Sequence, residues 1–96
     1  MASKKEYLDF VLGQLSNLDG ISARPMMGEY IIYVNSLVIG GIYDDRLLVK
    51  KCDLNKHYGM DEIIPYPNAR PMYFVTEVDD IEILEKIITD TYQGLM

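Results

Sequence analysis

Cys52 and His57 carry the strongest nucleophilic and acid–base chemistry in this chain, and they are its one cysteine and its one histidine. On a helix, a separation of five residues would turn the two side chains about 140° apart around the axis. A Cys–His nucleophile requires hydrogen-bonding distance between the two groups, and a zinc site requires clustered Cys, His or carboxylate ligands. The sequence therefore predicts neither a catalytic thiol nor a bound metal here.

Adjacent aspartates occur at residues 44–45 and 79–80, and adjacent glycines occur at residues 40–41. The aspartate pairs lie where a turn and a helix start favour Asp. The glycines lie inside a predicted strand without the spacing of a phosphate-binding loop, so they indicate close backbone approach or a bulge. No set of residues composes a catalytic site, and we expect a chain that is not an enzyme and binds no cofactor.

The composition is that of one small globular domain, which we expect to span residues 1–96. Apolar residues make up 49% of the chain and charged residues 25%, which excludes a disordered protein. No apolar run is long enough to cross a bilayer, no export signal is recognisable, and a single cysteine cannot form an internal disulfide. These features predict a cytoplasmic protein that does not bind membranes.

The net charge of −6 disfavours a general surface for duplex DNA, because an acidic protein repels phosphate backbones. The charge is uneven along the chain: residues 46–57 are rich in Lys and Arg, whereas residues 77–90 are rich in Asp and Glu. Two interpretations of the first segment stay open. It is either a solvated face of the domain or a local basic patch for an anionic partner.

Hydrophobic spacing predicts an α+β domain with two layers, in which N- and C-terminal helices pack on an antiparallel sheet made of a β-meander and one late strand. Ser3 and Glu6 have the spacing of a capping box before the first helix, and Asp79 and Glu82 repeat it before the last. Pro25 places the first strand at a sheet edge. The expected elements are a helix at 4–18, strands at 21–26, 29–34, 37–43 and 46–50, a short helix at 52–58, a proline-rich loop at 60–71, a strand at 72–75 and a final helix opening at 79–82.

The predicted turns assign the strand residues to two faces of the sheet. A two-residue turn at 35–36 pairs Ile32 with Ile39, and Leu48 then shares their face. We expect this face to be buried by a second copy of the chain, by a partner protein or by the loop at 60–71. The other face is apolar and is expected to lie under the helices; it carries Ile31, Tyr33, Val38, Gly40, Ile42, Leu47 and Val49.

Tyrosine and basic side chains at the ends of the first of these two faces are typical of sheets that stack single-stranded bases. Packing is the alternative role for such tyrosines, and the consensus strings of RNA-recognition sheets are missing. The candidate interaction face comprises Tyr30, Ile32, Ile39, Tyr43, Arg46, Leu48 and Lys50.

Four segments, in this order along the chain, carry a family resemblance: Arg24-x-Met26-Met27-Gly28-Glu29-Tyr30, Gly40-Gly41, Arg46-Leu47-Leu48-Val49-Lys50 and Arg70-Pro71-Met72-Tyr73. Together they resemble the N-terminal domain of the TfoX/Sxy family of bacterial competence regulators. The resemblance implies an α+β domain, a role in regulating genes for DNA uptake alongside the cyclic-AMP receptor protein, and no enzymatic activity. Glu29 stands where many members have Gly, and longer members add a helical C-terminal domain, so we expect a stand-alone form.

We therefore interpret the chain as a non-enzymatic interaction module that acts through protein contacts as a homodimer. The resemblance implies the cyclic-AMP receptor protein as a further partner. The alternative is a nucleic-acid-binding domain that uses the tyrosines, Arg46 and Lys50 of the sheet face. An enzyme with an unrecognised small-molecule site is the third interpretation.

Overall fold

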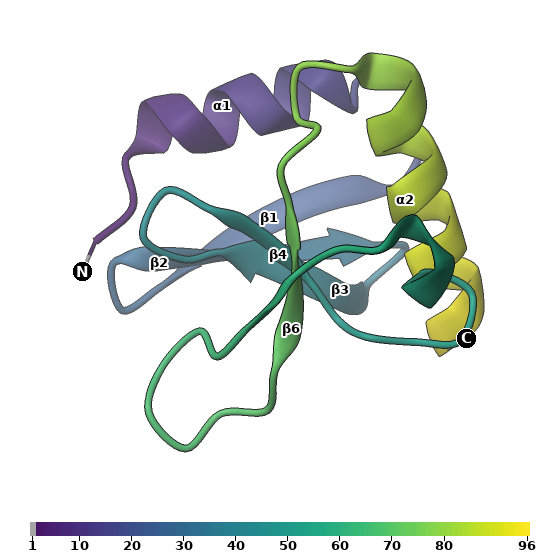
Figure 1. The fold of residues 1–96 in the computed structure, drawn as a ribbon. Helices are drawn as coiled ribbons and strands as arrows, with labels where there is room; N and C mark the ends of the chain where they lie inside the picture. The colour runs from purple at the N-terminus through teal and green to yellow at the C-terminus, as the bar shows by residue number, and fades with distance from the viewer. Residues whose placement is uncertain (1) are drawn as a thin grey trace.

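Both helices lie on the same side of one antiparallel sheet in the computed structural model, which describes residues 2–96 (Figure 1). Helix α1 spans Lys5–Gln14 and helix α2 spans Ile81–Leu95. The sheet has six strands in the order β1-β2-β3-β4-β6-β5, which confirms the predicted α+β architecture. The strands are β1 (Ile21–Met26), β2 (Glu29–Val34), β3 (Leu37–Ile42), β4 (Leu47–Val49), β5 (Glu62–Ile63) and β6 (Met72–Val75), and a 3₁₀ helix, η1 (Lys56–Tyr58), follows β4.

The strands predicted from hydrophobic patterning are confirmed over most of the sheet. β1, β2 and β6 begin and end where predicted, and β3 ends one residue before the predicted position 43. β1 is an edge strand, as Pro25 indicated. The two residues at the turns between β2 and β3, 35–36, and between β3 and β4, 44–45, have φ angles between 49° and 70°. Such left-handed pairs form type I′ turns, whose twist matches that of the flanking strands.

The predicted cap of the first helix is wrong. The Ser3 hydroxyl donates to a Glu29 carboxylate oxygen at 2.5 Å and accepts from the Asp45 N–H at 3.0 Å. The residue that precedes α1 is Lys4, which makes no side-chain cap. Ser3 is diverted because its own N–H donates to the Gly28 carbonyl at 2.9 Å, which holds the N-terminal arm against the turns of the sheet. α1 is also shorter than the predicted helix at 4–18.

The start of α2 is displaced by one residue from the prediction. Asp80, and not Asp79, caps this helix, because its carboxylate accepts the Ile83 N–H at 3.2 Å. Within the predicted helix at 52–58 only η1 is helical, and the predicted loop at 60–71 contains the short strand β5. Among residues 2–96, no helix combines the length and the apolar character needed to cross a membrane.

A β-bulge in β3 changes the register that was predicted for the β2–β3 hairpin. Ile32 pairs with Gly40 and not with Ile39, because β3 contributes an extra residue at this point. The glycines at 40–41 thus mark a bulge, as predicted, and also a close approach: a Cβ on Gly40 would lie 2.1 Å from the Leu48 carbonyl oxygen. Since a shift of one residue exchanges the two faces of a strand, the predicted faces are wrong for β2 and for the first half of β3.

The helices bury one side of the sheet completely. Ile32 and Ile39 are 0% exposed on this side, whereas the prediction placed Ile31 and Val38 there. The assignment of β4 is confirmed, because Leu47 and Val49 both face the helices. The buried core comprises Leu8, Val11, Leu15, Ile32, Val34, Ile39, Ile42, Leu47, Val49, Val75, Leu84, Ile87 and Ile88.

The other side of the sheet, called the open face below, has a smaller buried cluster made of Tyr43, Leu48 and Met72. The segment between β5 and β6 lies over this side, away from α1 (Figure 1). Of the three covers expected for the second sheet face, the proline-rich loop lies against the open face at Tyr43, through the ring of Tyr66. Over β2 the cover is incomplete, and Ile31 is only partly buried.

Candidate binding groove

Three residues of the predicted interaction face lie on the helix-covered side of the sheet and not on the open face. Ile32 and Ile39 are fully buried under the helices, and Tyr30 packs against the same core. The bulge in β3 is the cause, because the prediction assumed an unbroken register across the hairpin. These three residues therefore support the fold and cannot contact a partner on the open face.

The remaining four residues of that prediction are positioned around the open face. Tyr43 and Lys50 line a groove there, and Leu48 is buried beneath Tyr43. Arg46 is held in the turn between β3 and β4, where its Nε donates to the Tyr43 carbonyl oxygen at 3.3 Å. The structure thus keeps one aromatic and one cationic member of the predicted face at a common site.

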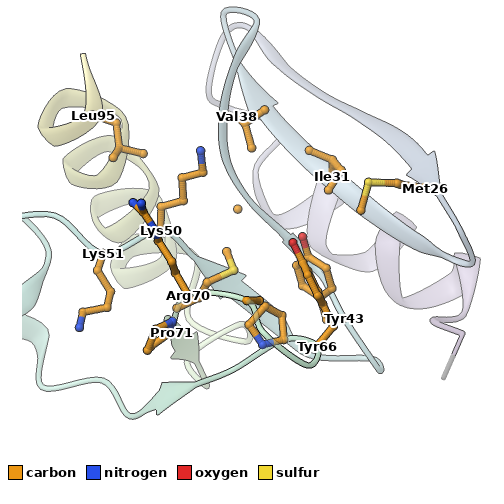
Figure 2. Close-up of a pocket in the computed structure, with 14 residues that line it drawn as sticks. Met26, Ile31, Val38, Tyr43, Lys50, Lys51, Tyr66, Arg70, Pro71 and Leu95 are labelled. Atoms are coloured by element: carbon orange, nitrogen blue, oxygen red, sulfur yellow. The ribbon is translucent and has the colours of Figure 1, made fainter.

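The groove has a volume of about 800 Å³ and lies between the open face and the segment at residues 65–71 (Figure 2). Ile31 and Val38 line it from β2 and β3, Met72 lines it from β6, and Pro65 and Pro71 line it from the segment. Pockets that hold small molecules commonly measure roughly 300–1,000 Å³ and are lined mainly by apolar groups. The groove therefore has the size and the lining of a ligand site.

Tyr43 and Tyr66 form an aromatic wall of this groove. Their ring centroids are 6.2 Å apart with an interplanar angle of 44°, within the range of attractive aromatic pairs. Tyr43 is buried whereas Tyr66 is 54% exposed, so the Tyr66 ring lies between Tyr43 and solvent. Burial raises the pKa of Tyr43, and the neighbouring Tyr66 and Glu29 raise it further. Tyr43 therefore stays uncharged and offers an apolar ring with a hydroxyl donor.

Lys50 and Arg70 extend toward the same end of the groove, away from the paired tyrosine rings (Figure 2). Neither side chain has a salt-bridge partner among residues 2–96. Lys51, the third cation at this site, donates to Glu62 at 2.8 Å, and this hydrogen bond raises the pKa of Lys51. One end of the groove therefore carries two cations that are not neutralised by the chain.

The basic segment at 46–57 does not form one continuous patch. Lys51 is paired with Glu62, and Lys56 is paired with Asp53 at 3.6 Å. Lys50 is the member of this segment that points to the groove, and it is joined there by Arg70 from a distant part of the chain. The local cationic site thus comes from tertiary structure and not from the charge run in the sequence.

A buried polar network fixes the backbone at Lys50. Asn55, which is 0% exposed, donates to the Lys50 carbonyl oxygen at 2.8 Å and to the Thr91 hydroxyl at 2.9 Å. Its side-chain oxygen accepts the Cys52 N–H at 3.0 Å. The Thr91 hydroxyl in turn donates to the Ile87 carbonyl oxygen at 2.7 Å. Since every group of the network is satisfied, it anchors the segment after β4 rigidly to α2.

The reactive residues that the sequence offered are not assembled into a site. The Cys52 thiol lies near the backbone carbonyl oxygens of Asp90 and Thr91, at 3.8 and 3.9 Å. The His57 ring stacks on Tyr58 with centroids 4.1 Å apart, and no hydrogen bond joins it to Cys52. No cluster of three or more His, Cys, Asp or Glu side chains with metal-binding geometry occurs in the described part of the chain.

Sequence reasoning missed Tyr66, Arg70 and Asn55 as members of the groove and its support. Tyr66 and Arg70 reach the groove because residues 64–71 fold back over the sheet, a path that no hydrophobic period specifies. The prolines around Tyr66 were the available signal, since they restrict the backbone of a loop before any contact forms. Asn55 gave no such signal, because its partner Thr91 lies 36 residues away.

Comparison with known proteins identifies a relative of this chain. An uncharacterised 12.7 kDa protein from the trpE 5′ region of Spirochaeta aurantia is 31% identical to this chain over 80 residues. The alignment covers 81% of this chain and 70% of the spirochaetal protein, so it spans most of the sheet. No protein-family model matches the chain.

Proposed function

This chain belongs to the same family as the Spirochaeta aurantia protein, and we propose that it is a non-enzymatic interaction module that acts through protein contacts. Its four ordered motifs resemble the N-terminal domain of the TfoX/Sxy regulators, so the proposed role is regulation of genes for DNA uptake. The proposal places the module in the cytoplasm, where a lone thiol such as Cys52 typically stays reduced.

The observation that carries this proposal is the partly uncovered open face. Ile31 and Val38 are only half-buried there, and Met26 and Met27, at the edge of the sheet, are 40% and 97% exposed. Exposed apolar patches mark contact sites in soluble proteins, and exposed methionines adapt to the shape of a partner. The proposed partners are a second copy of the chain and, by resemblance, the cyclic-AMP receptor protein.

Analytical ultracentrifugation of the purified chain from low to high micromolar concentration tests the homodimer. Met27→Glu should weaken self-association at least about tenfold, because it places a charge in an interface that excludes water. Ile81→Glu is the matched control, since Ile81 is also exposed, at 42%, but lies at the start of α2 on the helix side of the sheet. A chain that stays monomeric throughout, and does not retain the purified cyclic-AMP receptor protein, would overturn the proposal.

A second candidate function is binding of single-stranded nucleic acid on the same face. The supporting observation is that aromatic and cationic side chains share this face: Arg24 lies 5.9 Å from the Tyr33 ring centroid, and Lys50 and Arg70 line the same groove as Tyr43 and Tyr66. Stacking on tyrosine with phosphate contacts predicts an affinity for oligothymidylate that falls steeply with salt. Fluorescence anisotropy that shows no binding at low salt rules this candidate out.

A further inference from the structure

We propose that the groove binds a small amphipathic carboxylate, with the carboxylate at the Lys50–Arg70 end and an apolar body along the sheet. The inference goes beyond the interaction module proposed above, because it requires no partner protein. It stands on the shape, the lining and the charge of the groove alone (Figure 2).

The apolar body fits the middle of the groove. Ile31 and Val38 form one wall, and Tyr66 and Met72 lie across from them. The half-buried state of Ile31 and Val38 leaves apolar surface that a ligand would remove from water. Each methylene group buried in this way adds to the affinity of the complex, so a single alkyl chain or an aromatic ring suits this part of the groove.

The charged end selects the sign of the ligand. Lys50 and Arg70 are both cations without a salt-bridge partner among residues 2–96, and like charges held near each other repel unless an anion lies between them. The Glu62 carboxylate is engaged by the neighbouring Lys51 at 2.8 Å. An added carboxylate therefore meets two cations that have no salt-bridge partner among residues 2–96.

The net charge of the whole chain limits how many charges the ligand carries. At −6, the protein repels a polyanion at long range, whereas a ligand with one negative charge experiences mainly the two nearby cations. This argument favours a monocarboxylate over an oligonucleotide as the occupant of the groove.

Both walls of the groove are preorganised. The Lys50 N–H donates to the Ile39 carbonyl oxygen at 2.8 Å, and its own carbonyl oxygen is held by buried Asn55. On the other wall the Ala69 N–H donates to the Tyr66 carbonyl oxygen at 3.1 Å, which closes a tight turn before Arg70. Since little ordering remains to be done on binding, less of the interaction free energy is lost to entropy.

The proposed ligand also touches the surface through which the module is proposed to dock. Ile31 and Val38 line the groove and belong to the partly uncovered open face. A bound carboxylate would bury both side chains and change what a partner protein meets there. Binding of the ligand and contact with a partner are nevertheless separate events, which are measured separately.

Decanoate is the probe for this site, and decanol is its uncharged counterpart. Titration of the ¹⁵N-labelled chain with decanoate below its micelle concentration should shift amide resonances of Val38, Gly40, Lys50 and Ala69, with those of α1 unchanged. Decanol should bind at least about tenfold more weakly, because hydrogen bonds to charged groups contribute roughly 1.5–3 kcal/mol. The measurement is made at a concentration where ultracentrifugation finds the monomer, so its outcome does not depend on self-association.

Charge-neutral variants test the role assigned to the two cations. Lys50→Gln combined with Arg70→Gln should weaken decanoate binding at least about tenfold and leave decanol binding unchanged. Lys56→Gln is the matched control, because Lys56 is an exposed lysine that pairs with Asp53 outside the groove. Since Lys50 and Arg70 are both exposed, the double variant should keep the thermal stability of the parent chain.

Three outcomes would overturn the inference. Decanoate-induced shifts spread over α1 or over the whole chain would show non-specific binding. Equal affinity for decanoate and decanol, or equal losses in the double variant and in Lys56→Gln, would remove the anion site. Saturable groove shifts with oligothymidylate but none with decanoate would assign the groove to nucleic acid instead.

Discussion

The two faces of the sheet are built from alternate residues of the same strands, yet they differ in how they are closed. On the helix side, Ile32 and Ile39 are 0% exposed under α1 and α2. On the open face, the neighbouring residues Ile31 and Val38 stay half-buried beside a groove of about 800 Å³. The comparison separates the two tasks of the sheet, since one face stabilises the fold and the other is available for binding.

The difference follows from what covers each face. Helices bring a continuous apolar stripe, as Leu84, Ile87 and Ile88 do from α2. The segment at 64–71 has no regular secondary structure, so it covers β4 and β6 with a few contacts, such as that of Tyr66 with Tyr43, and leaves the surface of β2 and β3 uncovered. A loop closes a sheet face only in part because its backbone must itself remain hydrated or hydrogen-bonded.

Ile31 and Ile32 are adjacent in β2 but face opposite sides of the sheet. Their replacement should give the largest difference in the free energy of unfolding between the two faces. Ile32→Ala should lower the free energy of unfolding by about 2–5 kcal/mol, because it opens a cavity in a closed core. Ile31→Ala should cost less than about 1.5 kcal/mol, since solvent already reaches this side chain. Urea denaturation of both variants measures the difference. A larger loss for Ile31→Ala would mean that the strand lies in the register without the bulge.

The close approach of β3 to β4 can be tested at Gly40. A methyl group on Gly40 would lie 2.1 Å from the Leu48 carbonyl oxygen, a backbone atom that cannot move aside. Gly40→Ala should therefore cost about 1–3 kcal/mol through overpacking. The matched control is Gly13→Ala in α1, where an added methyl group meets nothing within 4 Å; this change should stabilise the chain by roughly 0.5–1 kcal/mol. Thermal melts of the two variants should shift in opposite directions.

Local chemistry made most of this fold predictable from the sequence. The strand boundaries followed from runs of Ile, Val and Tyr, and the turn at 35–36 followed from residues that tolerate a left-handed backbone. The sequence limited the next turn to 44–45 or 45–46, and the structure has it at 44–45. The edge position of β1 followed from Pro25. These features depend on residues that are close in sequence, so a single sequence is enough to predict them.

Features that depend on distant residues could not be predicted. The bulge leaves Ile39 without a pairing partner on β2, and this one extra residue reversed the faces assigned to β2. Ser3 appeared to be a helix cap because its competing partner, Glu29, lies 26 residues away. Of the groove, Tyr43 and Lys50 were predicted, whereas Tyr66 and Arg70 were not, because only the folded path of 64–71 brings them there.

The buried network at Asn55 connects α2, on the helix side of the sheet, to the groove. Its loss should have the third-largest effect on the free energy of unfolding. Asn55→Ala removes the hydrogen bonds to Lys50 and Thr91. It also leaves the Cys52 backbone N–H without its acceptor. The free energy of unfolding should fall by about 1–3 kcal/mol. Amide hydrogen exchange should accelerate over residues 50–58 more than in β2. Uniform acceleration across the sheet would instead show that Asn55 supports the whole fold and not this connection.

Tyr58 binds the other end of the segment at 50–58 to α2. Its contribution to the free energy of unfolding should be smaller and should depend on pH. Its hydroxyl donates to the Asp90 carboxylate at 2.6 Å, and burial, followed by this hydrogen bond, raises the pKa of Tyr58 from 10.0 to about 12. Tyr58→Phe should cost about 1 kcal/mol near neutral pH.

Because the pKa of Tyr58 is higher in the folded than in the unfolded chain, its contribution to stability is fully present below pH 10 and is lost as the pH rises toward about 12. Urea denaturation across this range should therefore show the gap between the parent chain and Tyr58→Phe narrowing as the pH increases. The parent chain alone does not isolate this effect, since the pKa values of Tyr7 and Tyr43 are raised as well, but both tyrosines are retained in the variant and cancel in the difference. A gap that stays constant to pH 12 would mean that the Tyr58–Asp90 hydrogen bond does not hold this segment, and that Asn55 alone anchors the groove to the closed face.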